Sequence, residues 1–382
     1  MKSEIKSNQT TIAPNAMLAP TIEHGSLHAY FIYDIADTID LLKLQNLGGS
    51  EFRQAQLQLR AVSSPSYIQF VVPPLAAELP PTEIMGLQAQ PRIKLYDYGT
   101  VSIRLSFSYS GSWSGFADLA RRLKQSEQLA SVSSQLLKQT LAQAKPALNK
   151  EHDPLVEDYF VLEVESFQPQ LTASQLLADY KDELASLILA ETGSVTPIEG
   201  QDALKVIFSF LQTDLAIVHW DAAFVFDSRE GAEAVESILE FANTQLVELR
   251  TYDARLDAEL DRIYRWNIAR EKPHWLLGHR ASEDRTDQLR NLLVDIRELC
   301  DRSNNALKII GDAFYARLYR GVALRLGLSD WQQQIESKLD SIGEVYRFAT
   351  DTRQHARSQF LEIIIIILIV VEIIIGVLRI GR

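Results

Sequence analysis

Through the first 230 residues, apolar residues either alternate with polar ones or gather in short β-branched blocks. Leu27–Ile35 is rich in aromatic and β-branched residues, and Leu215–Phe226 contains two short apolar runs. Ile93–Tyr109 alternates on both sides of a turn signal at Asp97–Gly99, and Asp158–Phe167 alternates again. A period of two is typical of a half-buried strand, and a turn signal inside it indicates a hairpin. We therefore predict strands in all these segments.

Helical spacing separates these strands without a regular repeat. Asp37 could cap a short helix that Gly48 and Gly49 would stop, and Ala173–Ala190 has the three- and four-residue spacing of a helix. Tyr67–Val72 is a further predicted strand, ended by prolines. Strands and helices mixed in this way indicate an α+β domain. We place it at residues 26–230, after a disordered leader over residues 1–25.

From residue 231 onward the apolar positions recur at three- and four-residue spacing. This predicts three long helices, the first ending near Arg270, the second covering Glu283–Leu326 and the third starting at Asp330. We expect them to form an antiparallel coiled-coil stalk over residues 231–359. The second and third helices each carry a stripe of apolar residues, and such stripes suit packing within one chain and between two chains equally well. The stripes are Leu289, Leu292, Ile296, Leu299, Leu307, Ile310 and Phe314 in the second helix, and Trp331, Ile335, Leu339, Ile342, Tyr346 and Ala349 in the third.

The segment Phe360–Ile380 contains 17 Ile, Leu, Val or Phe residues among its 21 positions. As a helix it would be about 30 Å long, which is the thickness of a bilayer core. Its apolar side chains contribute about −5 to −10 kcal/mol to insertion, against about +3 kcal/mol for Glu372. We predict that this segment is a transmembrane tail anchor. The residues that we assign to the membrane anchor are Phe360, Glu362, Glu372 and Arg379. The alternatives are a buried Ile-rich helix or a β-strand.

Composition and the N-terminal residues restrict the expected cellular location and the expected partners. The N-terminus is polar and has no apolar signal region, so we expect the α+β domain to be cytoplasmic. The net charge of −12 argues against direct nucleic-acid binding, although a local basic patch would still allow nucleic-acid tethering. Cys300 is the single cysteine, so it cannot form an intrachain disulfide, and it reads as a small apolar side chain on a helix face.

Motifs with defined chemistry are scarce. Gly111–Gly115 lies where a nucleophile elbow would lie, but Trp113 occupies the position of the serine, so we read it as a turn. His219 and Asp221 form either a catalytic pair or the end of a strand. Seven histidines make no metal-binding motif. We therefore assign no catalytic, cofactor-binding or metal residue and expect no cofactor. Acidic residues on the first long helix are read as a solvated face with i,i+4 arginine partners rather than a metal site: Glu248, Asp253, Asp257, Glu259 and Asp261.

The C-terminal part resembles the family named for yeast "required for meiotic nuclear division" proteins. The residues that carry the resemblance are Asp312–Tyr315, Trp331 with its helical spacing, Tyr346, and the run from Arg357 to Glu372. The resemblance implies a coiled coil that leads into an apolar C-terminal helix carrying two glutamates, at Glu362 and Glu372. It implies no catalytic residue, because that family supplies none.

These observations favour a membrane-anchored scaffold or adaptor whose α+β domain binds a protein partner or self-associates as a homo-oligomer, with the lipid bilayer as a further partner. The alternative is an enzyme at the membrane surface with a site in the α+β domain, His219 and Asp221 being its candidates. An enzymatic role is left open, with the scaffold favoured.

Overall fold

The computed structural model describes residues 20–47, 60–61, 70, 72–191, 193, 195–268, 294, 296 and 312–344. The chain divides into two compact units, and the boundary lies inside one long helix. The first unit comprises Met1–Asn243 with Ile309–Leu326, and the second comprises Thr244–Lys308 with Gly327–Arg382. Each unit is described below by itself.

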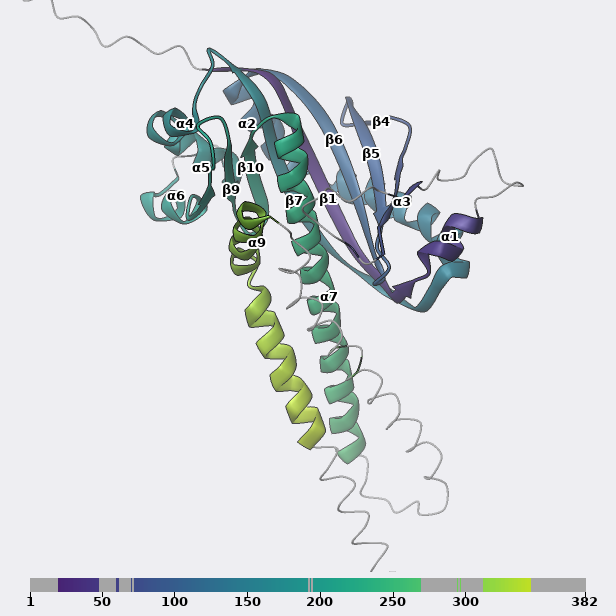
Figure 1. Cartoon of the computed structure of the whole chain (residues 1–382). Coiled ribbons are helices and arrows are strands. Elements are labelled where there is room, and N and C mark those ends of the chain that lie inside the picture. The colour runs from purple at the N-terminus through teal and green to yellow at the C-terminus, as the bar shows by residue number, and fades with distance from the viewer. Residues whose placement is uncertain are drawn as a thin grey trace, which may run out of the picture. The chain divides into compact units, whose positions relative to one another are not determined.

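The first unit is built on a mixed sheet that contains ten strands among the described residues. Their order is β2-β3-β5-β6-β1-β7-β10-β9-β8, with β4 paired to β5 (Figure 1). β7 and β10 are parallel, and the other described pairs are antiparallel. The strands are β1 (Thr21–Ile39), β2 (Arg60–Ala61), β3 (Leu75–Glu78), β4 (Thr82–Ile84), β5 (Leu87–Leu95), β6 (Thr100–Ser112), β7 (Leu148–Gln168), β8 (Val206–Phe208), β9 (Leu215–Val218) and β10 (Ala222–Phe226).

The helices fall between and after the strands. Those before β10 are α1 (Leu41–Leu47), α2 (Trp113–Lys124), α3 (Glu127–Ala144), α4 (Ala173–Asp179), α5 (Lys181–Leu189) and α6 (Pro197–Ala203), with a 3-10 turn at Lys145–Ala147. After the sheet come α7 (Arg229–Ile268), α9 (Ala313–Arg325) and a helix over residues 328–344. The predicted α+β N-terminal domain is therefore confirmed.

The predicted hairpin at Ile93–Tyr109 is confirmed as β5 and β6, which pair in antiparallel register from Leu95 opposite Val101. Gly99 turns the chain between them with a φ of +90°. A Cβ atom there would lie 1.7 Å from the carbonyl oxygen of Ala36, so only glycine fits this turn. The remaining predicted strands lie within β1, β7, β9 and β10, and most of Tyr67–Val72 lies outside the described residues.

The two faces of the sheet carry different side chains. On β1 the buried apolar residues Leu27, Ala29 and Phe31 point into the core, where α2 contributes Phe116 and Leu123. α2 and α3 cover this apolar face, and the first turns of α7 cover the other one (Figure 1). The alternate residues of β1, beginning Ser26, His28 and Tyr30, point to this second face, which is polar.

The second unit contains a helix pair that is held by ion pairs. Lys338 Nζ lies 2.7 Å from Asp253 Oδ1 and 2.6 Å from Asp257 Oδ1. Gln334 donates to Asp253, and the guanidinium of Arg250 lies over the ring of Trp331. These partners advance in the same direction along both helices, so α7 and helix 328–344 run parallel.

The structure changes the predicted order of the helices. A single second helix over Glu283–Leu326 is wrong at its C-terminal part, because Asp312 caps a new helix there by accepting from the amides of Phe314 and Tyr315. α9 belongs to the first unit. Most of 283–311 lies outside the described residues. At the other end of the chain, β1 begins at Thr21, inside the predicted leader, while residues 1–19 lie outside the described part.

The assignment as a tail-anchored membrane protein is corrected. Within residues 20–344, as far as they are described, no helix has both the length and the apolar character needed to cross a bilayer. The physical reason is visible in α7, whose surface carries charged residues such as Asp253 and Asp257 among its apolar ones. The predicted anchor residues Phe360, Glu362, Glu372 and Arg379 lie outside the described residues. The cytoplasmic placement of the α+β domain stays a prediction.

Candidate functional site

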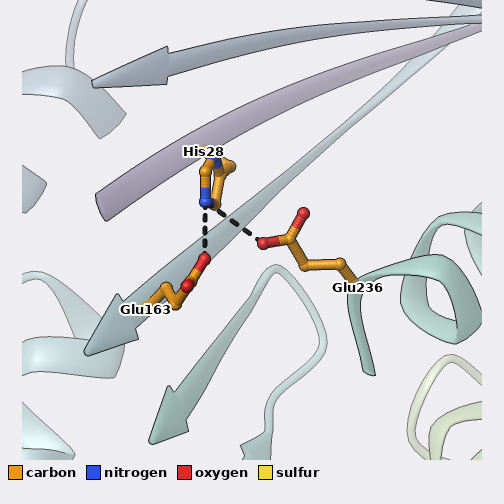
Figure 2. Close-up of side chains that lie close together, drawn as sticks. All are labelled: His28, Glu163 and Glu236. Carbon is orange, nitrogen blue, oxygen red and sulfur yellow. Dashed lines mark hydrogen bonds and ion pairs between the residues drawn. The ribbon is translucent and has the colours of Figure 1, made fainter. Parts of the chain in front are cut away.

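A histidine and two carboxylates converge on the polar face of the sheet (Figure 2). His28 Nε2 lies 2.9 Å from Glu163 Oε2 and 3.1 Å from Glu236 Oε1. One ligand atom from each of the three residues lies within 4.8 Å of the other two. Their side chains are 8%, 14% and 5% exposed, so Glu163 is the one that reaches solvent most.

Three elements bring these side chains together. His28 comes from β1 and Glu163 from the neighbouring strand β7, where the register places Glu163 opposite Ser26, one step along the same face. Glu236 comes from the second turn of α7, which crosses this face. Because β-strand side chains alternate, a shift of one residue in either strand would move its member of the cluster into the apolar core.

A second layer of hydrogen bonds fixes the cluster. Ser106 Oγ lies 2.8 Å from His28 Nδ1, which orients the ring so that Nε2 points at both carboxylates. The Tyr30 hydroxyl donates to Glu236 Oε2 over 2.7 Å, and Arg104 Nη1 donates to the same oxygen over 3.0 Å. Glu236 therefore presents Oε1 to the histidine while Oε2 is held by two donors. Such outer contacts set the orientation and basicity of ligating side chains.

A second ion pair lies one helical turn further along α7. Lys94 Nζ of β5 bonds to Glu240, and both side chains are almost fully buried. Together with Arg104, the cluster thus contains three carboxylates and two basic side chains, of which Lys94 has a pKa lowered by burial. With a neutral His28, one negative charge is left unbalanced in a buried setting. A buried net charge is unfavourable, so the cluster favours one additional positive charge, which a proton on His28, a proton on Glu163 or a metal ion would supply.

The electrostatics separate the two carboxylates of the cluster. Burial raises the pKa of the Glu163 carboxyl group, and the negative Glu236 raises it further. Burial acts in the same direction on Glu236, but the charges of His28 and Arg104 and the hydrogen bond from Tyr30 outweigh it and lower its pKa to about 2. Glu236 is therefore a permanent anion at neutral pH, and Glu163 is the carboxylate whose protonation is easier.

The geometry suits a six-coordinate divalent ion. With metal–ligand bonds of about 2.1 Å, neighbouring ligand atoms lie about 3.0 Å apart in an octahedron and about 3.4 Å apart in a tetrahedron. The separations of 2.9 and 3.1 Å between His28 Nε2 and the two carboxylate oxygens are compatible with an octahedral edge, and they are also hydrogen-bond distances. One imidazole and two carboxylates are ligands that Mn²⁺ accepts. With one ligand atom from each of the three residues, a six-coordinate ion would keep three positions open.

His219 and Asp221, the sequence candidates for a catalytic pair, lie in a different place. His219 Nδ1 is 2.8 Å from Asp221 Oδ1, and Lys124 Nζ is 2.7 Å from Asp221 Oδ2. The Tyr159 hydroxyl donates to the carbonyl oxygens of His219 and Ala222. The structure thus brings the pair together at the β9–β10 turn, where it ties the turn to the end of α2. This arrangement favours the interpretation that His219 and Asp221 mark the end of a strand.

The other sequence candidates also have defined positions. Ser112, inside Gly111–Gly115, caps α2 by accepting from the amide of Gly115, and Trp113 stacks on Phe167 in the core. The GSWSG segment is therefore the start of a helix. Two of the acidic residues on α7, Asp253 and Asp257, pair with Lys338 rather than with each other.

Sequence reasoning missed His28, Glu163 and Glu236. Two signals were present. In β1 and β6, polar residues alternate with apolar ones over many positions, which defines a polar sheet face. In α7, Glu236 and Glu240 stand four residues apart, on one side of a helix that is otherwise apolar there. Neither signal indicates that α7 packs against the polar face of the sheet.

Comparisons with known proteins identify the class of the domain. The model of the family described as "Uncharacterized protein MJ0711, N-terminal domain" matches residues 24–233, which is more than half of the chain. The chain belongs to this family. The match covers the sheet, and it includes His28 and Glu163 but ends just before Glu236.

One relative carries the same printed name. The chain is 28% identical to "Uncharacterized protein MJ0711" of Methanocaldococcus jannaschii over 182 residues, which are 47% of this chain and 54% of that protein. The chain therefore matches about half of the length of this relative. No solved structure matches the chain significantly.

The resemblance to the meiotic nuclear division family is wrong. The family that matches is the archaeal one, and it matches over residues 24–233, which do not include the C-terminal residues that carried the resemblance. That resemblance depended on helical spacing and an apolar run after Asp312. Such patterns recur in unrelated helices because any buried helix face needs apolar residues at three- and four-residue intervals.

Proposed function

We propose that the sheet and the start of α7 form a divalent metal-binding site that holds Mn²⁺ through His28, Glu163 and Glu236. The observation that supports this most is the placement of His28 Nε2 at 2.9 and 3.1 Å from two carboxylates that come from separate elements. The excess of carboxylates in the buried cluster, which a bound cation would balance, and the orienting contacts of Ser106 and Tyr30 add to it. The ion would link the sheet to α7.

The test is Mn²⁺ binding to the dialysed full chain, measured by electron paramagnetic resonance and by calorimetry. We expect one ion per chain, and Glu163→Gln should weaken binding at least tenfold because it removes a charged ligand. Glu165→Gln is the matched control, since Glu165 lies two residues further on the same strand and outside the cluster. No bound Mn²⁺, or equal affinity of the two variants, would contradict the proposal.

A stability measurement gives an independent check. A ligand that binds only the folded chain stabilises it by about 2.7 kcal/mol at a hundredfold excess over its Kd. We therefore expect Mn²⁺ to raise the melting temperature of the wild-type chain and of Glu165→Gln. Chelation with EDTA should reverse the shift, and Glu163→Gln should show little of it.

A role as a scaffold is a second candidate, supported by the helix pair of the second unit. α7 is 40 residues long, and its part after Asn243 lies beside helix 328–344, joined by Lys338 to Asp253 and Asp257. We propose that this pair extends into a coiled-coil stalk that binds a protein partner or a second copy of the chain. Light scattering of the full chain tests self-association: a dimer that Lys338→Glu disrupts would support it, and a monomer at all concentrations would contradict it.

A further inference from the structure

A groove opens on the polar face of the sheet next to the metal cluster. Its volume is ≈ 360 Å³, and its lining comes from β1, β6 and β7. The register places Ser26 opposite both Ser108 and Glu163, so these three side chains form one row across the face. His28 is the next residue of β1 on that face, so the groove begins one row away from the cluster.

Glu163 belongs to both the cluster and the groove. Its Oε2 contacts His28, and the residue also lines the groove. Among the three members of the cluster, it has the most exposed side chain. The buried sides of the cluster are occupied by Tyr30, Ser106 and Arg104. Open coordination positions of an ion held there would therefore face the groove.

The lining of the groove selects the charge of its ligand. Besides Glu163, which would hold the ion, it contains the carboxylates of Glu23 and Glu165 and several neutral polar groups: the side chains of His24 and Tyr109 and the hydroxyl groups of Ser26, Ser108 and Ser110. None of the described residues that line it is a lysine or an arginine. The two carboxylates that would not hold the ion, Glu23 and Glu165, repel an anion such as a phosphate ester, whereas they accept hydrogen bonds from ammonium and hydroxyl groups.

We infer that the groove binds a small amino alcohol, with one hydroxyl oxygen on the metal ion and the ammonium group on Glu23 and Glu165. The inference rests on the proposed metal-binding function, because the ion supplies the partner for the hydroxyl oxygen. A volume of ≈ 360 Å³ accommodates a molecule of this size together with water.

The experiment uses serinol (2-amino-1,3-propanediol) and the full chain loaded with Mn²⁺, with unbound ion removed by gel filtration. The paramagnetic ion shortens the proton relaxation time of any molecule that binds beside it. We expect enhanced relaxation of the serinol protons and at least a tenfold smaller effect on glycerol 1-phosphate, which is matched in size but anionic.

Two variants separate the groove from the metal site. Ser108→Trp fills the groove without replacing a member of the cluster, and we expect it to abolish the serinol effect while electron paramagnetic resonance still shows bound Mn²⁺. Ser131→Trp, on an exposed position of α3, is the matched control and should behave as wild type.

The outcomes are distinguishable. If wild-type protein binds Mn²⁺ without affecting serinol, the groove inference is wrong and the metal-binding function stands. If Ser108→Trp keeps the serinol effect, or if glycerol 1-phosphate relaxes equally, the groove is not the binding place for an amino alcohol. If no Mn²⁺ binds, both proposals are wrong.

Discussion

Helices pack against both faces of the central sheet, but the two contacts are of different kinds (Figure 1). On one face, β1 and β6 contribute fully buried apolar residues such as Leu27 and Ile103, which pack against Phe116 and Leu123 of α2. On the other face, α7 lies over Tyr30, Arg104 and Lys94 and meets them with Glu236 and Glu240. One interface is held by non-directional packing and the other by directed, charged hydrogen bonds.

The two interfaces are expected to contribute differently to the free energy of folding. Apolar burial contributes about 25 cal/mol per Å², whereas a buried ion pair gains little over an apolar pair because both charges lose their hydration. A purely stabilising interface under α7 would not need three buried carboxylates. The polar face therefore has the composition of a functional site, and the apolar face has that of a core. The following predictions test this comparison.

The largest effect is expected on the apolar face. Phe116 is fully buried within the core cluster, so Phe116→Ala should lower the free energy of unfolding by about 3 to 5 kcal/mol through lost packing and the cavity that remains. Chemical denaturation measures this value. Leu42→Ala is the control, because Leu42 is 71% exposed and should change stability by less than about 0.5 kcal/mol. Mn²⁺ affinity should stay unchanged in variants that remain folded.

The next effect concerns the Lys94–Glu240 pair on the polar face. Glu240→Met leaves Lys94 buried without its partner and should cost about 3 kcal/mol of unfolding free energy. The double variant Lys94→Met with Glu240→Met removes both charges and should recover most of this loss. A double-mutant cycle by chemical denaturation gives the coupling. If the double variant is as unstable as the sum of the singles, the pair is an essential stabilising contact and the comparison is wrong.

Sequence alone could predict the apolar face but not the polar one. The aromatic and β-branched residues of Leu27–Ile35 predict a strand. The alternation in Ile93–Tyr109 also predicts its buried side, because the period of two fixes which residues share a face. The turn at Gly99 fixes the register of one pair. These are local properties, so each can be read from a short segment.

The cluster depends instead on contacts between distant parts of the chain. His28 and Glu163 are 135 residues apart, and Tyr30 and Glu236 are 206 apart. The polar alternation of β1 and β6 predicts a face exposed to water, and nothing local indicates that a helix covers it. For the same reason the change of pattern at Gly231 does not mark the boundary between the two units, since α7 stays with the sheet as far as Asn243.

Acidic pH should reduce the contribution that the Lys94–Glu240 pair of the polar face makes to the free energy of unfolding. Burial raises the pKa of the Glu240 carboxyl group, but the charge of Lys94 and its hydrogen bond outweigh burial, so the pKa lies below its ordinary value of 4.5. A lowered pKa in the folded state stabilises the fold above the unfolded-state pKa, and this contribution is lost as pH falls through the folded-state pKa. The unfolding free energy of the wild type should therefore decline more steeply below pH 4.5 than that of the double variant, as measured by denaturation at a series of pH values.

The smallest effect is expected outside the sheet, in the helix pair of the second unit. Lys338 bonds to Asp253 and Asp257, and Asp257 is more than half exposed, so solvent screens part of the attraction. Lys338→Met should cost less than about 1 kcal/mol in low salt, and 0.5 M NaCl should remove most of the difference. The buried Lys94–Glu240 pair should keep its coupling in the same salt, because ions do not reach it. Equal salt sensitivity of the two pairs would show that the polar face under α7 is hydrated, and its carboxylates would then need no metal ion or proton to balance them.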